Sequence, residues 1–124
     1  MKTLIVEDDF TSRLLLQEIL KPYGPTHGAA NGEKAVEAVY AALKVHDPYD
    51  LICLDIMMPE MDGQQALKHI RAIEEENGII SSNRSKIIMT TALADKQNVI
   101  NAISSMADYY LLKPIDKAKL IDYQ

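Results

Sequence analysis

A chain of 124 residues, 48% of them hydrophobic, has the size of a single domain, which would span residues 1–124. Its formal net charge of −5 disfavours direct binding to nucleic acid, and its one cysteine, Cys53, excludes a disulfide scaffold or a cysteine-rich metal finger. No apolar run approaches the ~18 residues of a membrane span and no signal-peptide pattern follows Met1, so we expect a cytoplasmic protein that does not enter the membrane.

Short apolar runs that alternate with longer helical patterns indicate an α/β fold. Four such runs occupy residues 4–6, 51–54, 87–89 and 109–112, and a weaker strand is expected near residues 25–29. Runs that are apolar throughout are typical of parallel strands covered on both faces. The sequence therefore predicts a doubly wound, five-stranded parallel sheet with five helices, the fifth short or truncated.

Apolar residues spaced three and four apart mark the buried stripes of four helices. The stripes are Leu15 and Ile19; Val36, Val39, Tyr40 and Leu43; Ala66, Ile70 and Ile73; and Val99, Ile103 and Met106. Pro22 and Gly24 should end the first helix, and Asn31 should cap the second. A fifth helix should begin near Asp116, and the three glutamates at 74–76 are expected to form a solvated helix end.

Charged and hydroxyl side chains stand at the carboxyl ends of four of the predicted strands. They are Glu7, Asp8 and Asp9; Asp55; Thr90 and Thr91; and Lys113, which precedes Pro114. In a doubly wound sheet ligands bind beyond the carboxyl ends of the strands, so we expect these side chains to meet. Any one of them could merely cap a helix, but capping gives no role to Lys113, nor to Asp55, which lies several residues before its helix.

Clustered carboxylates repel one another, and this repulsion favours the binding of a cation. Because these side chains offer only oxygen ligands, the hard ion Mg²⁺ is favoured over Ca²⁺ or Zn²⁺. Mg²⁺ beside a free carboxylate, a hydroxyl and a lysine is the set of groups that phosphoryl transfer needs, with the carboxylate as nucleophile. The residues therefore predict a magnesium-dependent site that forms an acyl phosphate.

Four segments also resemble the successive motifs of a known family. They are residues 4–9, residues 54–63 with the sequence Leu-Asp-Ile-Met-Met-Pro-Glu-Met-Asp-Gly, residues 89–92 and residues 112–114. In order and spacing they are similar to the motifs of the receiver domain of two-component response regulators, over essentially the whole chain. The resemblance implies a flavodoxin-like, CheY-like fold and a signalling switch that takes a phosphoryl group from a histidine kinase or a histidine phosphotransfer protein.

The resemblance assigns roles to the acidic positions. It implies that Asp55 is the phosphoacceptor. It also implies that Mg²⁺ is bound directly by Asp8, through water by Glu7, by the backbone carbonyl of Met57, and by Asp55 itself. Asp9 falls one position beyond the acidic pair and is expected to cap the first helix.

Other positions match residues that contact the phosphoryl group and pass on the signal. Thr91, rather than Thr90, takes the hydroxyl position, and Lys113 would pair with a phosphoryl oxygen. Tyr110 matches the aromatic switch residue of the family. One departure is Met106, which stands where the family usually has glycine, so the close of the fourth helix is expected to differ.

Two classes of function follow from these assignments. The resemblance implies a signalling protein that catalyses only its own phosphoryl transfer and dephosphorylation. Such a protein acts by docking to a downstream partner or effector domain, or by forming a dimer on phosphorylation. The alternative is a Mg²⁺-dependent phosphohydrolase with an aspartyl-phosphate intermediate, but such an enzyme needs a second acid two residues after the nucleophile, where this chain has Met57. A receiver that only binds partners is disfavoured because the phosphorylation residues are all present: Asp8, Asp55, Thr91 and Lys113.

Overall fold

The computed structural model describes residues 1–58, 60–80, 82–91, 106–113 and 115–122. Within them a five-stranded sheet has the order β2-β1-β3-β4-β5, and every neighbouring pair of strands is parallel. The strands are β1 (Thr3–Val6), β2 (Thr26–Ala29), β3 (Leu51–Asp55), β4 (Lys86–Thr91) and β5 (Tyr109–Leu112). The predicted fold class and the five predicted strands are confirmed.

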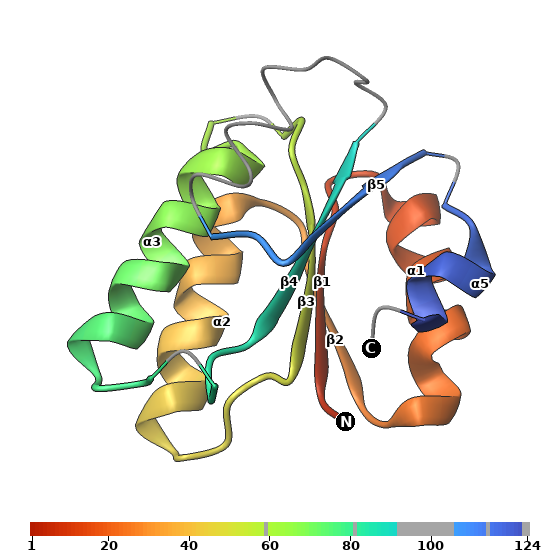
Figure 1. Ribbon diagram of the computed structural model, residues 1–124. Helices are drawn as coiled ribbons and strands as arrows, with labels where there is room; N and C mark the ends of the chain where they lie inside the picture. The colour runs from red at the N-terminus through yellow and green to blue at the C-terminus, as the bar shows by residue number, and fades with distance from the viewer. Residues whose placement is uncertain (59, 81, 92–105, 114, 123–124) are drawn as a thin grey trace.

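Helices cover both faces of the sheet: α2 and α3 lie on one face, and α1 and α5 lie on the other (Figure 1). Their bounds are α1 (Phe10–Leu20), α2 (Gly32–Lys44), α3 (Gly63–Glu76) and α5 (Lys117–Asp122), with a 3-10 turn (Lys21–Tyr23) after α1. The predicted fourth helix, with Val99 and Ile103, lies outside the described residues. No helix in the described part of the chain is both long and apolar enough to cross a membrane.

Alternation of side chains along the buried strands builds two cores, one on each face of the sheet. The core under α2 and α3 takes Leu4, Val6, Ile52, Leu54, Ile87 and Met89 from the strands. The core under α1 and α5 takes Ile5, Leu51, Cys53, Ile88 and Leu111. Cys53 is fully buried there, and burial raises the pKa of its thiol to about 12, as expected of an inert core residue.

Local side chains determine where the helices begin and end. The carboxylate or amide oxygens of Asp9, Asn31 and Asp62 each accept a hydrogen bond from the backbone N–H three residues later, at 3.0, 2.8 and 2.9 Å. Each bond satisfies a donor that the first helical turn leaves unpaired. After α1, Pro22 lies in the 3-10 turn and Gly24 closes it. The predicted caps at Asp9 and Asn31 are confirmed.

Three members of the predicted helix stripes are wrong, and one of them is Met106, which is 48% exposed and lies in a turn. Leu15 is 60% exposed, and Leu16 and Leu20 fill the core in its place. Because leucines occupy positions 14–16, a spacing of four fits more than one face of α1. Tyr40 is 47% exposed, and Val39 beside it carries the buried face of α2.

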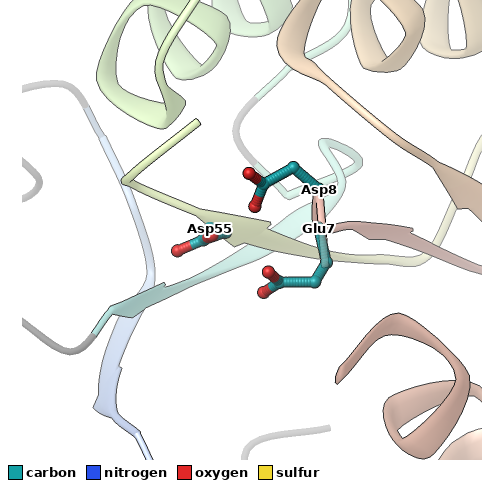
Figure 2. A group of neighbouring side chains, drawn as sticks. All are labelled: Glu7, Asp8 and Asp55. Atoms are coloured by element: carbon teal, nitrogen blue, oxygen red, sulfur yellow. The ribbon is translucent and has the colours of Figure 1, made fainter. Parts of the chain in front are cut away.

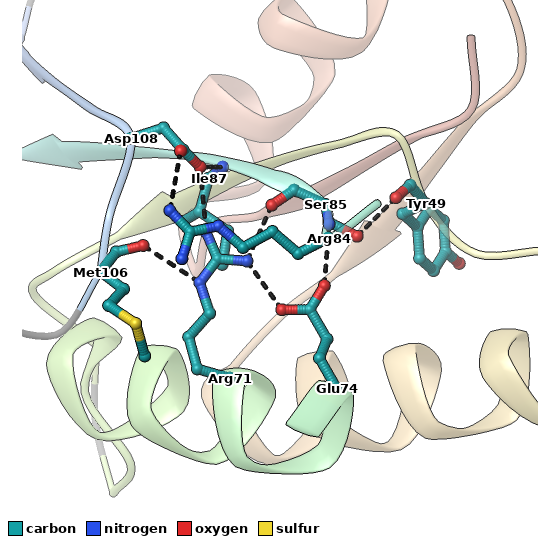
Figure 3. Close-up of polar contacts among 8 residues, drawn as sticks. All are labelled: Tyr49, Arg71, Glu74, Arg84, Ser85, Ile87, Met106 and Asp108. Atoms are coloured by element: carbon teal, nitrogen blue, oxygen red, sulfur yellow. Dashed lines mark hydrogen bonds and ion pairs between the residues drawn. The ribbon is translucent and has the colours of Figure 1, made fainter. Parts of the chain in front are cut away.

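The prediction that the glutamates at 74–76 are all solvated is also wrong, because Glu74 is buried. Figure 3 shows its polar contacts. Its carboxylate accepts hydrogen bonds from Arg71 Nη1 and from the backbone N–H of Ser85, both at 2.7 Å. Arg71 also donates to the Asp108 carboxylate at 2.9 Å and to the Met106 carbonyl at 3.0 Å. This buried network, called the Arg71 network below, joins α3 to the starts of β4 and β5.

Candidate functional site

Three carboxylates meet at the carboxyl ends of the central strands (Figure 2). Glu7 and Asp8 directly follow β1, and Asp55 is the last residue of β3. Because Val6 pairs with Leu54, the residues that follow them, Glu7 and Asp55, lie side by side. One carboxylate oxygen from each of the three acids lies within 4.8 Å of the others.

Lys113 reaches the same place from the end of β5. Its ammonium lies 2.7 Å from a carboxylate oxygen of Glu7 and 3.5 Å from one of Asp55. Its backbone N–H donates to the Thr91 carbonyl at 2.8 Å, which anchors the residue beside β4. The Glu7 side chain is 1% exposed, so this ion pair neutralises an acid that water hardly reaches.

The surroundings of Asp55 oppose its charge. Burial, and secondarily the neighbouring charge of Glu7, raise the pKa of Asp55 from 3.8 to about 6, although Lys113 acts in the other direction. Burial alone would lower the pKa of Lys113, but its hydrogen bond to Glu7 and the charge of Asp55 outweigh this and raise it. Among the described side chains, the Lys113 ammonium pairs with two of the three carboxylates, Glu7 and Asp55, so a single positive charge does not balance the cluster.

This set of ligands fits a divalent magnesium ion. All three side chains offer oxygen, the ligand type that Mg²⁺ prefers, and their spacing allows them to share one ion. The backbone N–H of Met57 donates to Asp55 at 3.4 Å, while the Met57 side chain is 59% exposed. Asp9 is engaged as the cap of α1, which leaves Glu7, Asp8 and Asp55 as the acidic cluster.

Gly63 brings α3 close to Asp55. Its backbone N–H donates to the Ile56 carbonyl at 2.9 Å, and a Cβ atom at this position would collide with the backbone of Asp55. The sequence showed this glycine only as part of a motif. The structure gives the physical requirement, which is a close approach of two backbone segments.

The comparison with known proteins agrees with this geometry. Residues 3–123 match the family described as response regulator receiver domain. The chain belongs to the response regulator receiver family. It is 35% identical to the chemotaxis protein CheY of Bacillus subtilis, over 98% of this chain and 92% of CheY. Some relatives are much longer: the chain spans 12% of a rice protein named probable histidine kinase 2, with 31% identity.

Solved structures of receivers are also similar. The receiver domain of the histidine kinase CKI1 from Arabidopsis thaliana, in complex with Mg²⁺, has a TM-score of 0.85 and 26% identity, covering 98% of this chain and 88% of that one. The receiver domain of Ssk1 from Saccharomyces cerevisiae, solved with the phosphotransfer protein Ypd1, has a TM-score of 0.82 and 28% identity, with coverages of 98% and 83%. These similarities show that the chain has the CheY-like receiver fold.

The two threonines at the end of β4 face opposite sides of the receiver sheet. Strand alternation places Thr90 on the face of Ile88, with Asp55, and Thr91 on the face of Met89. Both threonines are buried. Tyr110 packs against the Met89 core, the face of Thr91, so the two predicted switch residues share one face.

A hollow of about 210 Å³ lies beside the receiver's acidic cluster. It is lined by Glu7, Ser12, Leu15, Leu16, Lys113 and Ile115. On α1 next to it, Phe10, Leu14 and Leu15 are 65%, 46% and 60% exposed. An exposed apolar helix face beside a charged site is typical of a protein interaction surface, and the sequence had assigned Leu15 to the core instead.

Proposed function

We propose that this receiver is a phosphorylation-activated switch of a two-component phosphorelay. In this proposal Asp55 accepts a phosphoryl group from a histidine kinase or a histidine phosphotransfer protein, and the loaded form acts by altered docking to a protein partner or effector domain. The observation that carries the proposal is the cluster of Glu7, Asp8 and Asp55 with Lys113 at the carboxyl edge of the sheet.

In the proposed reaction a carboxylate oxygen of Asp55 attacks the phosphorus of a phosphohistidine. The P–O bond forms as the P–N bond breaks, and the electron pair leaves with the imidazole. Glu7, Asp8, Asp55 and the backbone carbonyl of Met57 would hold Mg²⁺, which when bound neutralises charge on the phosphoryl oxygens. Lys113, now 3.5 Å from Asp55, would pair with a phosphoryl oxygen of the product.

The proposed output passes through Thr91 and Tyr110. A phosphoryl group on Asp55 adds oxygens that accept hydrogen bonds, and the Thr91 hydroxyl at the neighbouring strand end would move toward them. Tyr110 lies on the same face as Thr91 and would turn as the hydroxyl moves. The surface around β5 and α5 would change shape, which is the signal that a downstream partner or a second copy of the receiver would read.

The exposed apolar face of α1 supports docking of the phosphoryl donor. Phe10, Leu14 and Leu15 are exposed on α1, and Leu15 also lines the hollow with Lys113 and Ile115. A donor that covers them would bring its phosphohistidine to the acidic edge of the sheet. The alternative of a phosphohydrolase gains no support, because the exposed side chain two residues after Asp55 is the apolar Met57.

The test is phosphorylation by acetyl phosphate, followed by intact-mass spectrometry. Wild type should gain one phosphoryl group with Mg²⁺ and none with excess chelator, and Asp55→Asn should gain none. Two adjacent acids provide a matched pair: Asp8→Asn should lose the Mg²⁺-dependent reaction, whereas Asp9→Asn, which keeps the helix cap, should retain it. A stable adduct in Asp55→Asn, or equal behaviour of the Asp8 and Asp9 variants, would refute the assignment.

A further inference from the structure

The side chain of Thr90 is buried without a hydrogen-bond partner. Thr90 is 1% exposed, and its hydroxyl has no partner in the part of the chain that the structure describes. Burying an unpaired hydroxyl costs free energy, so most such groups are satisfied. Such a hydroxyl can form a bond in another state of the protein where an acceptor lies beside it.

The sheet register places Thr90 in the row of the acidic cluster. Asp55 pairs with Thr90 across β3 and β4, and Glu7 lies on the other side of Asp55. On the β5 side, Thr90 pairs with Leu111. Leu111 lies two residues before Lys113, so both point to the face of the sheet that α1 and α5 cover. The unpaired hydroxyl is thus a direct neighbour of the proposed phosphoacceptor, whereas Thr91 lies on the opposite face.

In this structure the two carboxylate oxygens of Asp55 make long contacts with Met57 and Lys113. One accepts from the Met57 N–H at 3.4 Å, and the other lies 3.5 Å from Lys113. Lys113 is held more closely by Glu7, at 2.7 Å. Both contacts of Asp55 are longer than a strong charge-assisted hydrogen bond, so its carboxyl group retains capacity to accept another.

We infer that Thr90 is a positioning residue of the phosphorylation site, whose hydroxyl donates to a carboxyl oxygen of Asp55 in the loaded state. The inference rests on the proposed role of Asp55. The register pairs Thr90 directly with Asp55, and the bond needs no covalent change. A bond present in the loaded state and absent in the unloaded state stabilises the loaded state selectively.

Thr3 offers a matched control on the same face of the sheet. It too is 1% exposed with an unpaired hydroxyl, but it lies at the start of β1, where it pairs with Leu51. Leu51 is four residues before Asp55, roughly 13 Å along the strand. Replacing either threonine by the isosteric valine removes a buried unpaired hydroxyl, and only the change at Thr90 should affect the site.

The experiment measures beryllofluoride binding with Mg²⁺, together with thermal melting in chelator. Thr90→Val and Thr3→Val should both melt at or above the temperature of wild type, because no hydrogen bond is lost. The Kd for beryllofluoride should rise about fivefold in Thr90→Val, equivalent to about 1 kcal/mol, and stay unchanged in Thr3→Val. Thr90→Ser should restore the wild-type Kd, and Thr90→Ala serves as a second variant without the hydroxyl.

An unchanged Kd in Thr90→Val and Thr90→Ala, with normal binding by wild type, would overturn the inference and leave the proposed function standing. An equal rise in Thr3→Val would also overturn it, because the effect would then be general to the sheet. Failure of wild type to bind beryllofluoride, or to accept a phosphoryl group, would instead refute the proposed function.

Discussion

At Asp55 the receiver holds a carboxyl group in surroundings that oppose its ionisation. Its pKa is raised to about 6, through burial first and the charge of Glu7 second. Because the ionised form is disfavoured in the folded state, Asp55 lowers the free energy of unfolding at every pH at which its carboxyl group is charged. This cost is absent below about pH 4, grows as the pH rises, and is complete above about pH 6.

The variant Asp55→Asn, which cannot ionise, should therefore be more stable than wild type at neutral pH in chelator. The gain should be largest above pH 7 and vanish toward pH 4. Chemical denaturation across that range measures it. As a control, Asp122→Asn at an exposed position should change stability by less than about 0.5 kcal/mol at every pH. A gain for Asp55→Asn that does not depend on pH would contradict this explanation.

Met106 has a backbone conformation that favours glycine. Its φ is 68°, and its carbonyl accepts a hydrogen bond from Arg71 at 3.0 Å. This explains in physical terms why the departure from the family's usual glycine matters, since a side chain in the left-handed region is strained. The strain lies just before β5, in the segment that the Arg71 network holds.

Met106→Gly should raise the free energy of unfolding by about 1 kcal/mol, because glycine adopts this φ without strain. Little packing is lost, since Met106 is 48% exposed. Met106→Ala is the matched control: it removes the same side chain but keeps a Cβ, so it should give no gain. Equal stabilisation by glycine and alanine in urea denaturation would show that the side chain, and not φ, is responsible.

At the scale of elements, the Arg71 network joins α3 to the starts of two strands. The Arg71 side chain is 4% exposed and pairs with Glu74 and Asp108. The Asp108 carboxylate also accepts a hydrogen bond from the backbone N–H of Ile87 at 2.8 Å and forms an ion pair with Arg84 at 3.3 Å. Asp108 thereby links β4 to β5 (Figure 3). The network lies at the amino ends of these strands and holds the edge of the sheet that ends at Lys113.

Arg71→Met should lower the free energy of unfolding by about 3 to 5 kcal/mol, because it leaves the buried Glu74 carboxylate without its cation and Asp108, which is 23% exposed, with Arg84 alone. Lys34→Met is the matched control. It removes the cation of another pair at the same i,i+3 spacing, 3.8 Å from Glu37, but both side chains there are about two-thirds exposed. It should cost less than about 0.5 kcal/mol. Similar losses in both variants would mean that burial does not determine the effect.

At the scale of the whole molecule, the sheet separates the proposed chemistry from the proposed output. Glu7, Asp55 and Lys113 lie on the α1 and α5 face, whereas Thr91 and Tyr110 lie on the α2 and α3 face. β4 contributes a side chain to each of these two faces, because its last two residues, Thr90 and Thr91, point to opposite sides of the sheet. A change at Asp55 can therefore reach Tyr110 through the end of one strand.

Removal of the Thr91 hydroxyl should uncouple these two faces. Thr91→Ala should still accept a phosphoryl group on Asp55, but NMR shifts around Tyr110 on addition of beryllofluoride and Mg²⁺ should be smaller than in wild type. Tyr109, which packs on the opposite face, provides an internal reference. Identical shifts at Tyr110 in both proteins would exclude Thr91 from the coupling.

The sequence alone determined the fold class, the strands, the helix caps and the set of acids at the carboxyl edge. These features depend on short-range patterns. Buried parallel strands are apolar throughout, and a capping side chain accepts a hydrogen bond from the backbone N–H three residues later. Parallel strands also bring their carboxyl ends to the same edge of the sheet. These patterns are enough to place Asp55, Glu7 and Asp8 together at one edge of the sheet.

Only the tertiary structure decided which side chains are buried where a local pattern permits two answers. The leucines of α1 allow more than one buried face, and the sheet selects Leu16 over Leu15. Glu74 belongs to a run of charges, yet it is buried because Ser85, 11 residues away, and Arg71 satisfy its carboxylate. The sequence marked Met106 only as a departure from the family's usual glycine, and its φ of 68°, which causes the strain, comes from the structure. The energy of a buried charge or hydroxyl depends on partners that only folding brings together, and no local pattern contains them.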